Sequence, residues 1–487
     1  MKFINLIAAS SIALAAVSCS GSRFAPSASP NPWADDYSSV SSMDNYRSWG
    51  TYNVHDPAIT LVGDTFYMYS TDAIFRENRD EARRHGVKLG FVQMRKSTDL
   101  VNWEFAGWAF SEIPAEAKKW VTDLNNGHGA TNVWAPYMVD NGNGTFHLYY
   151  CVSAFGRKTS YIGLAEAPSP LGPWKHKGAV VKTDNSSVMN AIDPTIITAG
   201  GKRFMHYGSF FGGLFCLEID PATGMPCIEG DQGHLVARRA NYRRDNLEAP
   251  EIIHNPANGK YYLFGSYDPL MTTYNVRVGR SDSPTGPFVD FNGKQMADTT
   301  DNFPILTAPY RFNGHPGWIG TAHCGVFADK KGNFYMAHQG RLASDAGMMV
   351  LNLRRVFFTP SGWPVVSPER YAATPDRRFS ARDLEGEWEI MRIHEPTADR
   401  RLEAGQILWG EGALLDGEWN LPSNLTLTAG GDWKFDSKKQ LLSVKIGNET
   451  ITDLIVHAGH DWEKQTDTVL FTGLDSEGRS VWGKRIK

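Results

Sequence analysis

A short unit that recurs five times along the chain constrains the fold more than any other feature. Four copies open on an X-Pro segment, and in all five a turn containing glycine leads into an aromatic-rich run. The copies begin at His55, Trp134, Ile192, Glu248 and His323, and the last of them lacks the proline. Two apolar runs separated by a glycine- or asparagine-bearing turn are typical of a β-hairpin. Each copy therefore predicts one hairpin.

The segments that follow three of the copies also resemble one another. They are KSTDLVNWEFAG from Lys96, EAPSPLGPWKHKG from Glu166 and RSDSPTGPFVDFNG from Arg280. Units of roughly 55 to 80 residues with about four strands and no long amphipathic helix favour a β-propeller. A large β-sandwich would not require five copies of one motif. We predict an all-β chain with a five-bladed β-propeller over residues 47–375.

A second domain is expected after the repeat stops, between Trp363 and Pro375. New short strands separated by turns run from about Leu384 to Lys487, which predicts a small β-barrel or sandwich over 384–487. Its tryptophans could bind sugar or belong to its core. They are Trp388, Trp409, Trp419 and Trp462.

The first residues have the pattern of an export signal. A positive end at Lys2 and the apolar run from Phe3 to Val17 predict a signal peptide over 1–18. The run ends at Cys19 as in a bacterial lipobox, so we expect a lipid-anchored protein at the outer membrane or cell surface, with ordinary cleavage to a periplasmic or secreted protein as the alternative. Residues 19–46, rich in Ser, Pro, Ala and Asn, are expected to form a flexible tether, with structure beginning near Trp49.

The other four cysteines, Cys151, Cys216, Cys227 and Cys324, have spacings that match neither a zinc site nor a dense disulfide framework. Most are expected to be buried thiols. Cys216 and Cys227 are the only pair close enough in sequence to suggest a disulfide.

Charge argues against several classes of partner. The formal net charge is -4 without a block of like charge, so nothing favours nucleic acid or an anionic membrane surface. We expect a neutral substrate, a monomer, and membrane contact only through the lipid anchor.

Three carboxylates fall at matching places in the repeat. Asp56 and Asp193 immediately precede the proline, and Glu248 and Trp134 stand one position earlier. The first strand of each propeller blade lines the central channel, so these side chains are expected to meet at one end of it. The residue before proline is expected to be extended, which suits the start of a strand.

Each carboxylate also has a plainer interpretation. Asp-Pro often opens turns, and Glu248 or Glu251 could be a solvated charge at a strand end. Their recurrence in three repeats favours chemistry, because buried carboxylates are costly to keep. Carboxylates that face each other across a neutral, aromatic-lined hollow are suited to glycoside hydrolysis, with one as general acid and another as base or nucleophile.

Five motifs in order give the chain a specific resemblance. They are His55-Asp56-Pro57, Trp134-Ala135-Pro136, Asn190 to Pro194, Gly208 to Gly213 and Glu248-Ala249-Pro250. Across residues 49–487 the chain resembles glycoside hydrolase family 43, and in particular its endo-α-1,5-L-arabinanases with a C-terminal β-barrel.

This resemblance implies an inverting mechanism that cleaves arabinan. Asp56 would be the general base that activates water, Glu248 the general acid, and Asp193 the residue that orients the acid and tunes its pKa. Inversion needs carboxylates about 6.5 to 9.5 Å apart to admit the water.

The resemblance also implies which residues bind substrate and metal. Trp134 would form an aromatic wall, and Asp56, Asn190, Ala191, Ile192, Asp193, Ser209, Phe210 and Phe211 would line the cleft. Blade packing is the alternative, above all for one of the two phenylalanines, since strand alternation lets only one face the cleft. A Ca²⁺ ion in the channel would be touched by His323 and held largely by waters. A channel histidine without metal is the alternative, since Ca²⁺ prefers oxygen ligands.

Two other functions remain open from the sequence. An exo-acting α-L-arabinofuranosidase or β-xylosidase of the same family would place the same carboxylates in a closed pocket. A non-catalytic glycan-binding lipoprotein would keep the propeller without turnover. The long loop from Ala73 to Val87 could form part of the cleft rim.

Overall fold

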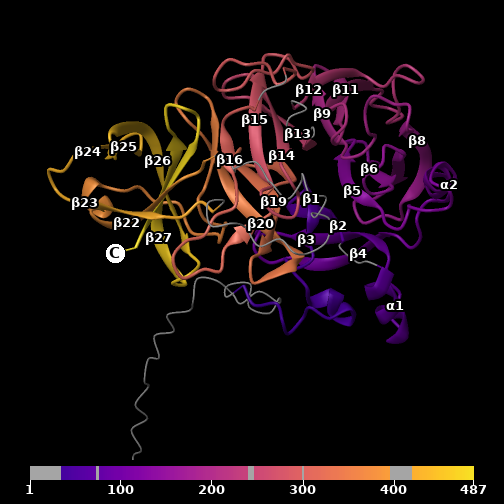
Figure 1. Ribbon diagram of the computed structural model, residues 1–487, viewed down its shortest axis with the longest axis horizontal. Helices are drawn as coiled ribbons and strands as arrows, with labels where there is room; N and C mark the ends of the chain where they lie inside the picture. Colours follow the sequence, from indigo (N-terminus) through magenta and orange to yellow (C-terminus); the bar gives the residue numbers. More distant parts are fainter. Residues whose placement is uncertain (1–34, 73–75, 240–245, 299–300, 395–418, 487) are drawn as a thin grey trace, which may run out of the picture.

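The computed structural model describes residues 35–72, 76–239, 246–298, 301–394 and 419–486 (Figure 1). Five antiparallel sheets follow one another along the chain, and a sixth forms its C-terminal part. The predicted all-β fold with a five-bladed propeller is confirmed.

Each of the first four blades is a meander in which neighbouring strands pair in sequence order. The first blade is β1 to β4, with bounds His55–Val62, Thr65–Thr71, Phe91–Ser97 and Glu104–Phe110. The second is β5 to β8, at Trp134–Asp140, Phe146–Ser153, Ser160–Ala167 and Lys175–Thr183. The third is β9 to β12, at Thr195–Ala199, Lys202–Tyr207, Leu214–Ile219 and His234–Ala237.

The last two blades follow the same plan with shorter outer strands. The fourth is β13 to β16, at Leu247–Asn255, Lys260–Tyr267, Asn275–Ser281 and Ile305–Thr307. The fifth is β17 to β21, at Trp318–Ile319, Cys324–Ala328, Phe334–Leu342, Asp345–Phe358 and Pro364–Val366. In the fifth blade β17 and β18 both pair with β19.

The innermost strands close into a ring. β1 contacts β5, β5 contacts β9, β9 contacts β13, β13 contacts β18, and β18 contacts β1 again. The closure is reinforced by backbone hydrogen bonds from Val54 to Met349 and from Leu351 to Thr51, which join the start of the propeller to its last blade. Equivalent positions on the five inner strands are therefore neighbours around one channel.

The hydrophobic cores lie between adjacent blades. One packs Ile59 and Phe66 of the first blade against Phe327 and Tyr335 of the fifth. Similar clusters join the first to the second blade, the second to the third, and the third to the fourth. Burial of both faces of each sheet is what fixes the radial arrangement.

The segment before the propeller corrects the predicted tether boundary. Residues 35–48 pack onto the fold and include a 3-10 helix, η2 (Met43–Ser48). Tyr37, Val40 and Met43 are buried, and the side chain of Asp35 accepts hydrogen bonds of 2.6 and 2.7 Å from Arg370. Structure therefore begins at least as early as Asp35, because these side chains find a buried partner surface. Cys19 and the predicted signal peptide lie outside the described residues.

The C-terminal domain is one seven-stranded antiparallel sheet, in the order β23-β22-β28-β27-β26-β25-β24, that curls beside the propeller (Figure 1). A short helix, α3 (Ala381–Leu384), precedes it. Its strands β22 to β28 span Gly386–Arg392, Ser423–Leu427, Trp433–Asp436, Leu441–Ile446, Glu449–Asp461, Thr466–Leu474 and Ser480–Arg485. A curled single sheet agrees with the barrel prediction and not with a sandwich.

The tryptophans and cysteines named in the sequence analysis are mostly buried parts of the fold. Trp388 is fully buried in the core of the C-terminal sheet, and Trp462 is buried over the guanidinium of Arg370. Trp419 is half-buried, and Trp409 lies outside the described residues. All four cysteines of the described part are free thiols, and only Cys227 is exposed.

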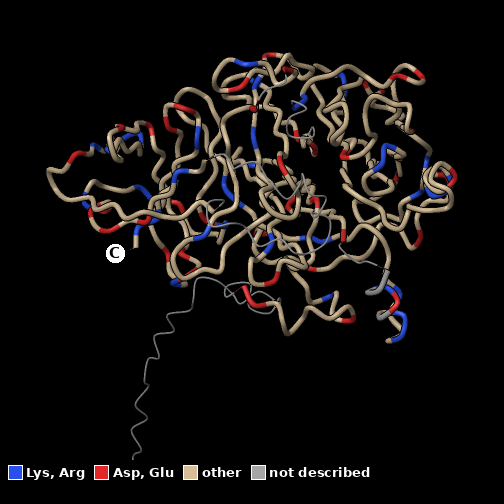
Figure 2. Tube along the Cα trace, in the orientation of Figure 1, with Lys and Arg blue, Asp and Glu red and all other residues tan. Residues whose placement is uncertain are grey.

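Two further helices interrupt the blades. α1 (Arg76–Arg84) lies in the long loop between β2 and β3, and α2 (Ala115–Leu124) lies between the first two blades. Within the described ranges, none of the helices is long and apolar enough to cross a membrane. Figure 2 shows acidic and basic residues interspersed along the chain, which agrees with the absence of like-charge blocks in the sequence.

Candidate active site

The five inner strands share a backbone kink at the same place. In each copy of the repeat, the residue at the position of Asp56 has a positive φ, between 41° and 57°. These residues are Asp56, Ala135, Asp193, Ala249 and His323. The predicted extended geometry before proline is therefore wrong. Left-handed φ is uncommon outside glycine and is found where the surrounding fold enforces it, often at functional sites.

The kink coincides with an interruption of strand pairing in three blades. The register shifts between His55 and Ala58, between Trp134 and Tyr137, and between Glu248 and Glu251. β-bulges of this kind re-aim side chains near active sites. Asp56, Asp193 and His323 stand at the kink itself, whereas Glu248 stands one residue earlier. The carboxylates thus reach one channel mouth from two different positions of the repeat.

Asp56 is held ionised by histidine. The Nδ1 atom of His323 lies 2.8 Å from Oδ1 of Asp56, and Nε2 of His55 lies 3.5 Å from the same oxygen. Burial opposes the charge, but the pKa of Asp56 is held well below its ordinary value, chiefly by the attraction and hydrogen bond of His323. Burial lowers the pKa of His55 to about 4, so that ring is neutral at neutral pH. Burial opposes the charge of His323, but Asp56, with Asp193 and Glu248, raises its pKa to about 9.

Glu248 has the opposite electrostatic character. Burial raises the pKa of Glu248, partly offset by two hydroxyl donors that favour its ionised form. Ser209 donates to Oε2 at 2.7 Å, and Tyr274 donates to Oε1 at 2.6 Å. The two donors hold both carboxyl oxygens in place, so the orientation of Glu248 is fixed from neighbouring elements.

Backbone contacts place Ser209 opposite Glu248. The amide of Phe210 donates to Leu247 O at 2.8 Å, and Ser209 forms an isolated bridge with Glu248. Gly208 makes this close turn possible: its φ is 133°, and a Cβ there would lie 2.4 Å from the carbonyl oxygen of Gly213. The motif of residues 208–213 therefore has a structural reason to contain glycine.

Asp193 lies close to both Glu248 and Asp56. Its Oδ2 accepts a hydrogen bond of 3.2 Å from the backbone amide of Ala249, the residue after Glu248. Burial raises the pKa of Asp193 well above its ordinary value; the charge of His323 opposes this rise, while Glu248 and Asp56 add to it. An ionised Asp56 beside two carboxyls of raised pKa is a combination suited to general base and general acid work.

A small cavity of about 20 Å³ lies in the channel among these groups. A cavity of this size holds about one water molecule. Prolines or their equivalents from all five blades line it, namely Pro57, Pro136, Pro194, Pro250 and Cys324. Glu251 also lines it and is only 3% exposed, so it is not the solvated charge that the sequence allowed.

The residues implied to bind substrate divide into two groups. Ser209 and Asn190 are buried with their side chains in hydrogen bonds: Ser209 donates to Glu248, and Asn190 Oδ1 accepts from the hydroxyl of Ser160 at 2.6 Å. Trp134 and Phe210 are half-buried, and Phe211 is 39% exposed. Both phenylalanines have positive φ and lie on a loop, so the strand alternation argument does not apply to them.

Ala191 and Ile192 belong instead to the hydrophobic core between the second and third blades. Ala191 is fully buried. The expectation that its side chain lines the cleft is therefore corrected, because core packing already surrounds it. Ile192 still has a backbone role, since its carbonyl accepts a hydrogen bond of 2.9 Å from Gly208.

Several residues at the channel mouth were missed from the sequence. Tyr274 stands before β15, where the repeat has no shared motif. Phe155 and Val188 are 56% and 68% exposed, on loops that leave the same end of their strands as Asn190 and Phe211 do. A Cβ on Gly212 would lie 2.4 Å from the carbonyl oxygen of Val188, so these loops touch. Exposed apolar side chains on adjoining loops could have been noticed only with the fold in hand.

Among the described residues, no group of three or more His, Cys, Asp or Glu side chains is arranged to hold a metal ion. His323 and His55 offer imidazole nitrogens at the channel, and Nδ1 of His323 is already paired to Asp56. A metal there would need most of its ligands from water.

Comparisons with known protein families match both parts of the chain. Residues 50–364 match the model of glycosyl hydrolases family 43, and residues 368–483 match a C-terminal lipocalin-like domain found with that family. The resemblance inferred from the five motifs is therefore confirmed.

Two curated relatives span the chain differently. An extracellular endo-α-(1→5)-L-arabinanase of Thermotoga petrophila is 27% identical over 89% of this chain and 94% of its own. An extracellular exo-α-(1→5)-L-arabinofuranosidase, ArbA of Cellvibrio japonicus, is 31% identical over 64% of this chain and 86% of its own.

Solved structures have the same fold. The structure of endo-1,5-α-L-arabinanase from Thermotoga petrophila RKU-1 superposes with a TM-score of 0.74 at 24% identity, covering 90% of this chain and 99% of that one. An α-L-arabinanase of Cellvibrio cellulosa, solved with arabinohexaose, gives 0.53 at 29% identity, covering 65% of this chain and 95% of that one. Together with the family match over most of its length, the propeller and its carboxylates identify this chain as a glycosidase that belongs to glycosyl hydrolases family 43.

Proposed function

We propose that this protein hydrolyses internal α-1,5 linkages of arabinan by an inverting mechanism. The observation that carries the proposal is the pairing at one channel mouth of a carboxyl with a lowered pKa, Asp56, and one with a raised pKa, Glu248. The names of the relatives support arabinan as the substrate class, and two relatives whose matches each cover 89% of this chain are named as endo-acting enzymes.

The ionised Asp56 acts as general base in this proposal. It removes a proton from the attacking water, which adds to the anomeric carbon of the sugar. The nearby His323 cation stabilises the carboxylate before the reaction and keeps it ionised at neutral pH. The cavity beside Asp56 has room for about one water, but the reacting water would stand on the substrate side.

Glu248 acts as general acid and gives its proton to the leaving glycosidic oxygen. Its raised pKa favours the protonated form that a general acid needs. Asp193 accepts a hydrogen bond from the amide of Ala249, the residue after Glu248, so in this proposal it positions the acid and tunes its pKa. Ser209 and Tyr274 hold the acid in orientation.

The walls of the cleft are proposed from the exposed side chains around this centre. Trp134 and Phe211, with Phe155 and Val188 on adjoining loops, offer apolar surface to furanose rings. Asn190 and Ser209 provide polar contacts. Exposed apolar side chains on several loops suit an open cleft along which a chain can lie.

A time course of products from linear α-1,5-arabinan, resolved by chain length, tests the endo assignment. An early ladder of mixed oligosaccharides is expected. Arabinose as the only product from the first time point would instead assign the exo activity that the Cellvibrio japonicus relative has in its name. Absence of any product would favour a glycan-binding protein.

Calcium in the channel is a further part of the proposal. His323 would have to lose its proton to face the ion as a neutral imidazole, and waters would complete the shell, since Ca²⁺ takes 6 to 8 oxygen ligands. The ion would supply positive potential to the channel. Equilibrium dialysis with ⁴⁵Ca²⁺ tests this, and the His323→Ala variant is expected to lose the bound ion.

Export and monomeric state complete the proposal. Relatives named as extracellular support export. Lipidation at Cys19 is proposed from the lipobox alone, together with the signal peptide over 1–18 and domains over 47–375 and 384–487. Metabolic labelling with a palmitate analogue, compared with the Cys19→Ala variant, tests the anchor.

A further inference from the structure

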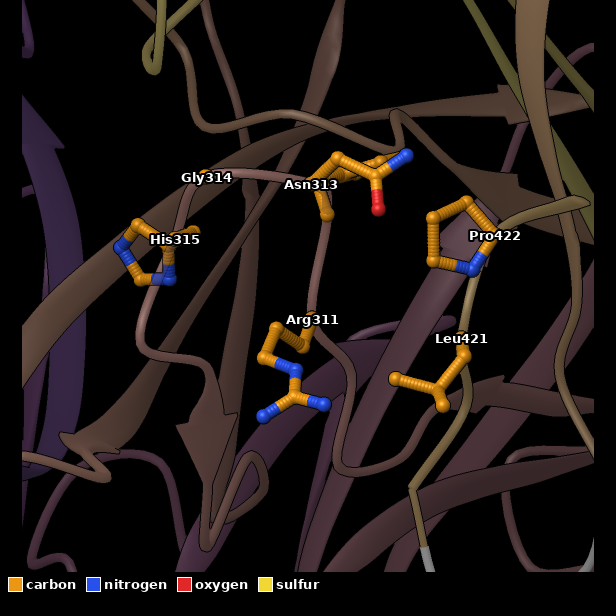
Figure 3. A pocket seen from close by; sticks show the side chains of 7 residues that line it. Arg311, Asn313, Gly314, His315, Leu421 and Pro422 are labelled. Carbon is orange, nitrogen blue, oxygen red and sulfur yellow. The ribbon is translucent and has the colours of Figure 1, made fainter.

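A second hollow lies away from the channel, where the propeller meets the C-terminal domain. Its volume is about 400 Å³, within the range of about 300 to 1,000 Å³ that is usual for small-ligand sites. One wall is the loop of residues 311–315 and the other is Leu421 and Pro422. Figure 3 shows Leu421 and Pro422 facing Arg311 and Asn313 across the hollow. The proposed hydrolysis uses none of these residues.

The two walls are held together by backbone hydrogen bonds. The amide of Arg311 donates to Asn420 O at 3.1 Å, and both the amide and the side chain of Asn420 donate to Pro309 O, at 3.1 and 2.9 Å. The hollow is therefore pre-formed and needs no rearrangement to accept a ligand.

Arg311 is the group in this lining whose charge has no carboxylate partner within the described part of the chain. Its side chain is exposed, and its guanidinium lies over the ring of Trp419, 5.4 Å from the centroid. The other polar side chains are engaged outward. Asn313 donates to Glu389 at 2.8 Å, and Nε2 of His315 lies 3.2 Å from Asp35.

The nearby carboxylates do not neutralise Arg311, because other cations hold them. Asp35 accepts hydrogen bonds from both terminal nitrogens of Arg370. Glu389 lies 4.0 Å from Nζ of Lys484. The hollow therefore presents one uncompensated positive charge beside an apolar wall, in which Leu421 is 47% exposed.

Stacking of a neutral sugar on tryptophan does not suit this hollow. Arg311 lies over the ring of Trp419, and a Cβ on Gly317 would lie 2.4 Å from that ring, so Gly317 backs it closely. The planar guanidinium fork matches a carboxylate, with two parallel hydrogen bonds. Leu421 and Pro422 can pack against the C–H face of a pyranose ring.

We propose that this hollow binds a carboxylate-bearing sugar, a hexuronate unit of an acidic polysaccharide, through Arg311. Such a site would hold the enzyme on acidic polymers while the separate channel cleaves a neutral chain. The inference goes beyond the proposed hydrolysis and does not depend on it.

Affinity electrophoresis of the purified protein through gels that contain polygalacturonate tests the proposal. The wild-type protein is expected to be retarded, and Arg311→Gln is expected to bind at least about tenfold more weakly, the loss of one bidentate charged contact. Arg382→Gln removes another exposed arginine, from α3, and is the matched control that keeps full retardation. Equal retardation of all three proteins, or none of the wild type, would overturn the proposal.

A second pair of variants keeps the test independent of any folding defect in Arg311→Gln. Leu421→Glu should weaken retardation and Leu421→Lys should strengthen it, with both thermal midpoints close to that of the wild type. The same effect of both substitutions would contradict a charge-selective site. The same variants are also run through gels that contain linear arabinan. If Arg311→Gln loses retardation in the arabinan gels and not in the polygalacturonate gels, the site binds a neutral sugar and the acidic assignment is wrong.

Discussion

The channel mouth and the junction between propeller and C-terminal domain both bury several carboxylates, but they balance the charge differently. At the junction, Asp35 accepts two hydrogen bonds from Arg370. Lys484 lies 2.8 Å from Glu369, 3.5 Å from Asp461, and in contact with Glu463. At the channel mouth, three carboxyls share the histidines beside Asp56, and no Lys or Arg is paired with them within the described ranges.

The difference separates structural from chemical use of a buried carboxylate. Direct pairing with Arg370 lowers the pKa of Asp35 and gives it a fixed negative charge, which suits a domain junction. Burial without a directly paired Lys or Arg leaves Glu248 and Asp193 with raised pKa values, although their hydroxyl and amide donors oppose the rise, and this favours the protonated forms. A proton that can be given away is what an acid catalyst needs.

Substitution at the channel mouth should have the largest effect. Glu248→Gln keeps the shape but removes the transferable proton, so kcat/KM on arabinan is expected to fall about 100- to 10,000-fold. The free energy of unfolding should not decrease, since a costly buried carboxyl is replaced by a neutral amide. Steady-state kinetics and urea unfolding check both parts. Glu229→Gln, an exposed glutamate, is the matched control. If the Glu248→Gln protein were destabilised but still active, Glu248 would have a structural and not a chemical role.

Substitution at the junction should show the opposite pattern. Arg370→Ala leaves Asp35 buried without its cation, and the free energy of unfolding is expected to fall by about 3 to 5 kcal/mol. The kcat of the folded fraction should stay at the wild-type value. Denaturant unfolding measures the loss, with the exposed Arg382→Ala as control. A loss below about 1 kcal/mol would mean that residues 35–48 are not docked through this pair.

The pH dependence of stability sharpens the comparison within the junction. Burial, with Glu463 nearby, raises the pKa of Glu369 to about 8 despite the attraction of Lys484. In the unfolded chain it ionises near 4.5. Between these values the unfolded state releases a proton that the folded state keeps, so stability falls as pH rises from about 5 to 8.

The Glu369→Gln variant removes this linkage. Its free energy of unfolding, measured by urea at several pH values, should decline less over that interval than that of the wild type. An unchanged slope would show that Glu369 is already ionised throughout, with Lys484 fully compensating it.

The smallest expected effect is a shift of the pH profile at the channel mouth. Tyr274→Phe removes a donor that favours the ionised form of Glu248, so the pKa of Glu248 should rise further. The acid then stays protonated to higher pH, and the alkaline limb of kcat/KM should move up by about one pH unit. Tyr207→Phe, whose hydroxyl donates to Gln232 O at 2.7 Å, is the control. A shift to lower pH would contradict the assigned donor role.

The repeat was enough to predict the blades, because each copy encodes one hairpin and its continuation. The ring closure followed from the count of copies. The sequence did not predict the docked segment before Trp49, since Tyr37, Val40, Met43 and Tyr46 lie at irregular spacing within a Ser-rich stretch. Their burial depends on a surface made by distant residues.

The candidate site was predicted in its carboxylates but not in its geometry. Asp56, Asp193 and Glu248 could be found because they recur beside proline. The positive φ at Asp56 and Asp193 could not, because a pre-proline residue ordinarily avoids it and the bulge depends on the neighbouring strands. Tyr274 donates to Glu248 from a segment outside any repeated motif. Nothing in the sequence around Ala191 indicates that its side chain is buried.

Dependence on the leaving group tests the assignment of acid and base most directly. Linear arabinan has a poor leaving group that needs protonation, whereas a 4-nitrophenyl arabinotrioside has one that does not. Glu248→Gln should lose most of its activity on arabinan and little on the aryl trioside, while Asp56→Asn should lose both. Equal losses of Glu248→Gln on the two substrates would contradict its role as the general acid.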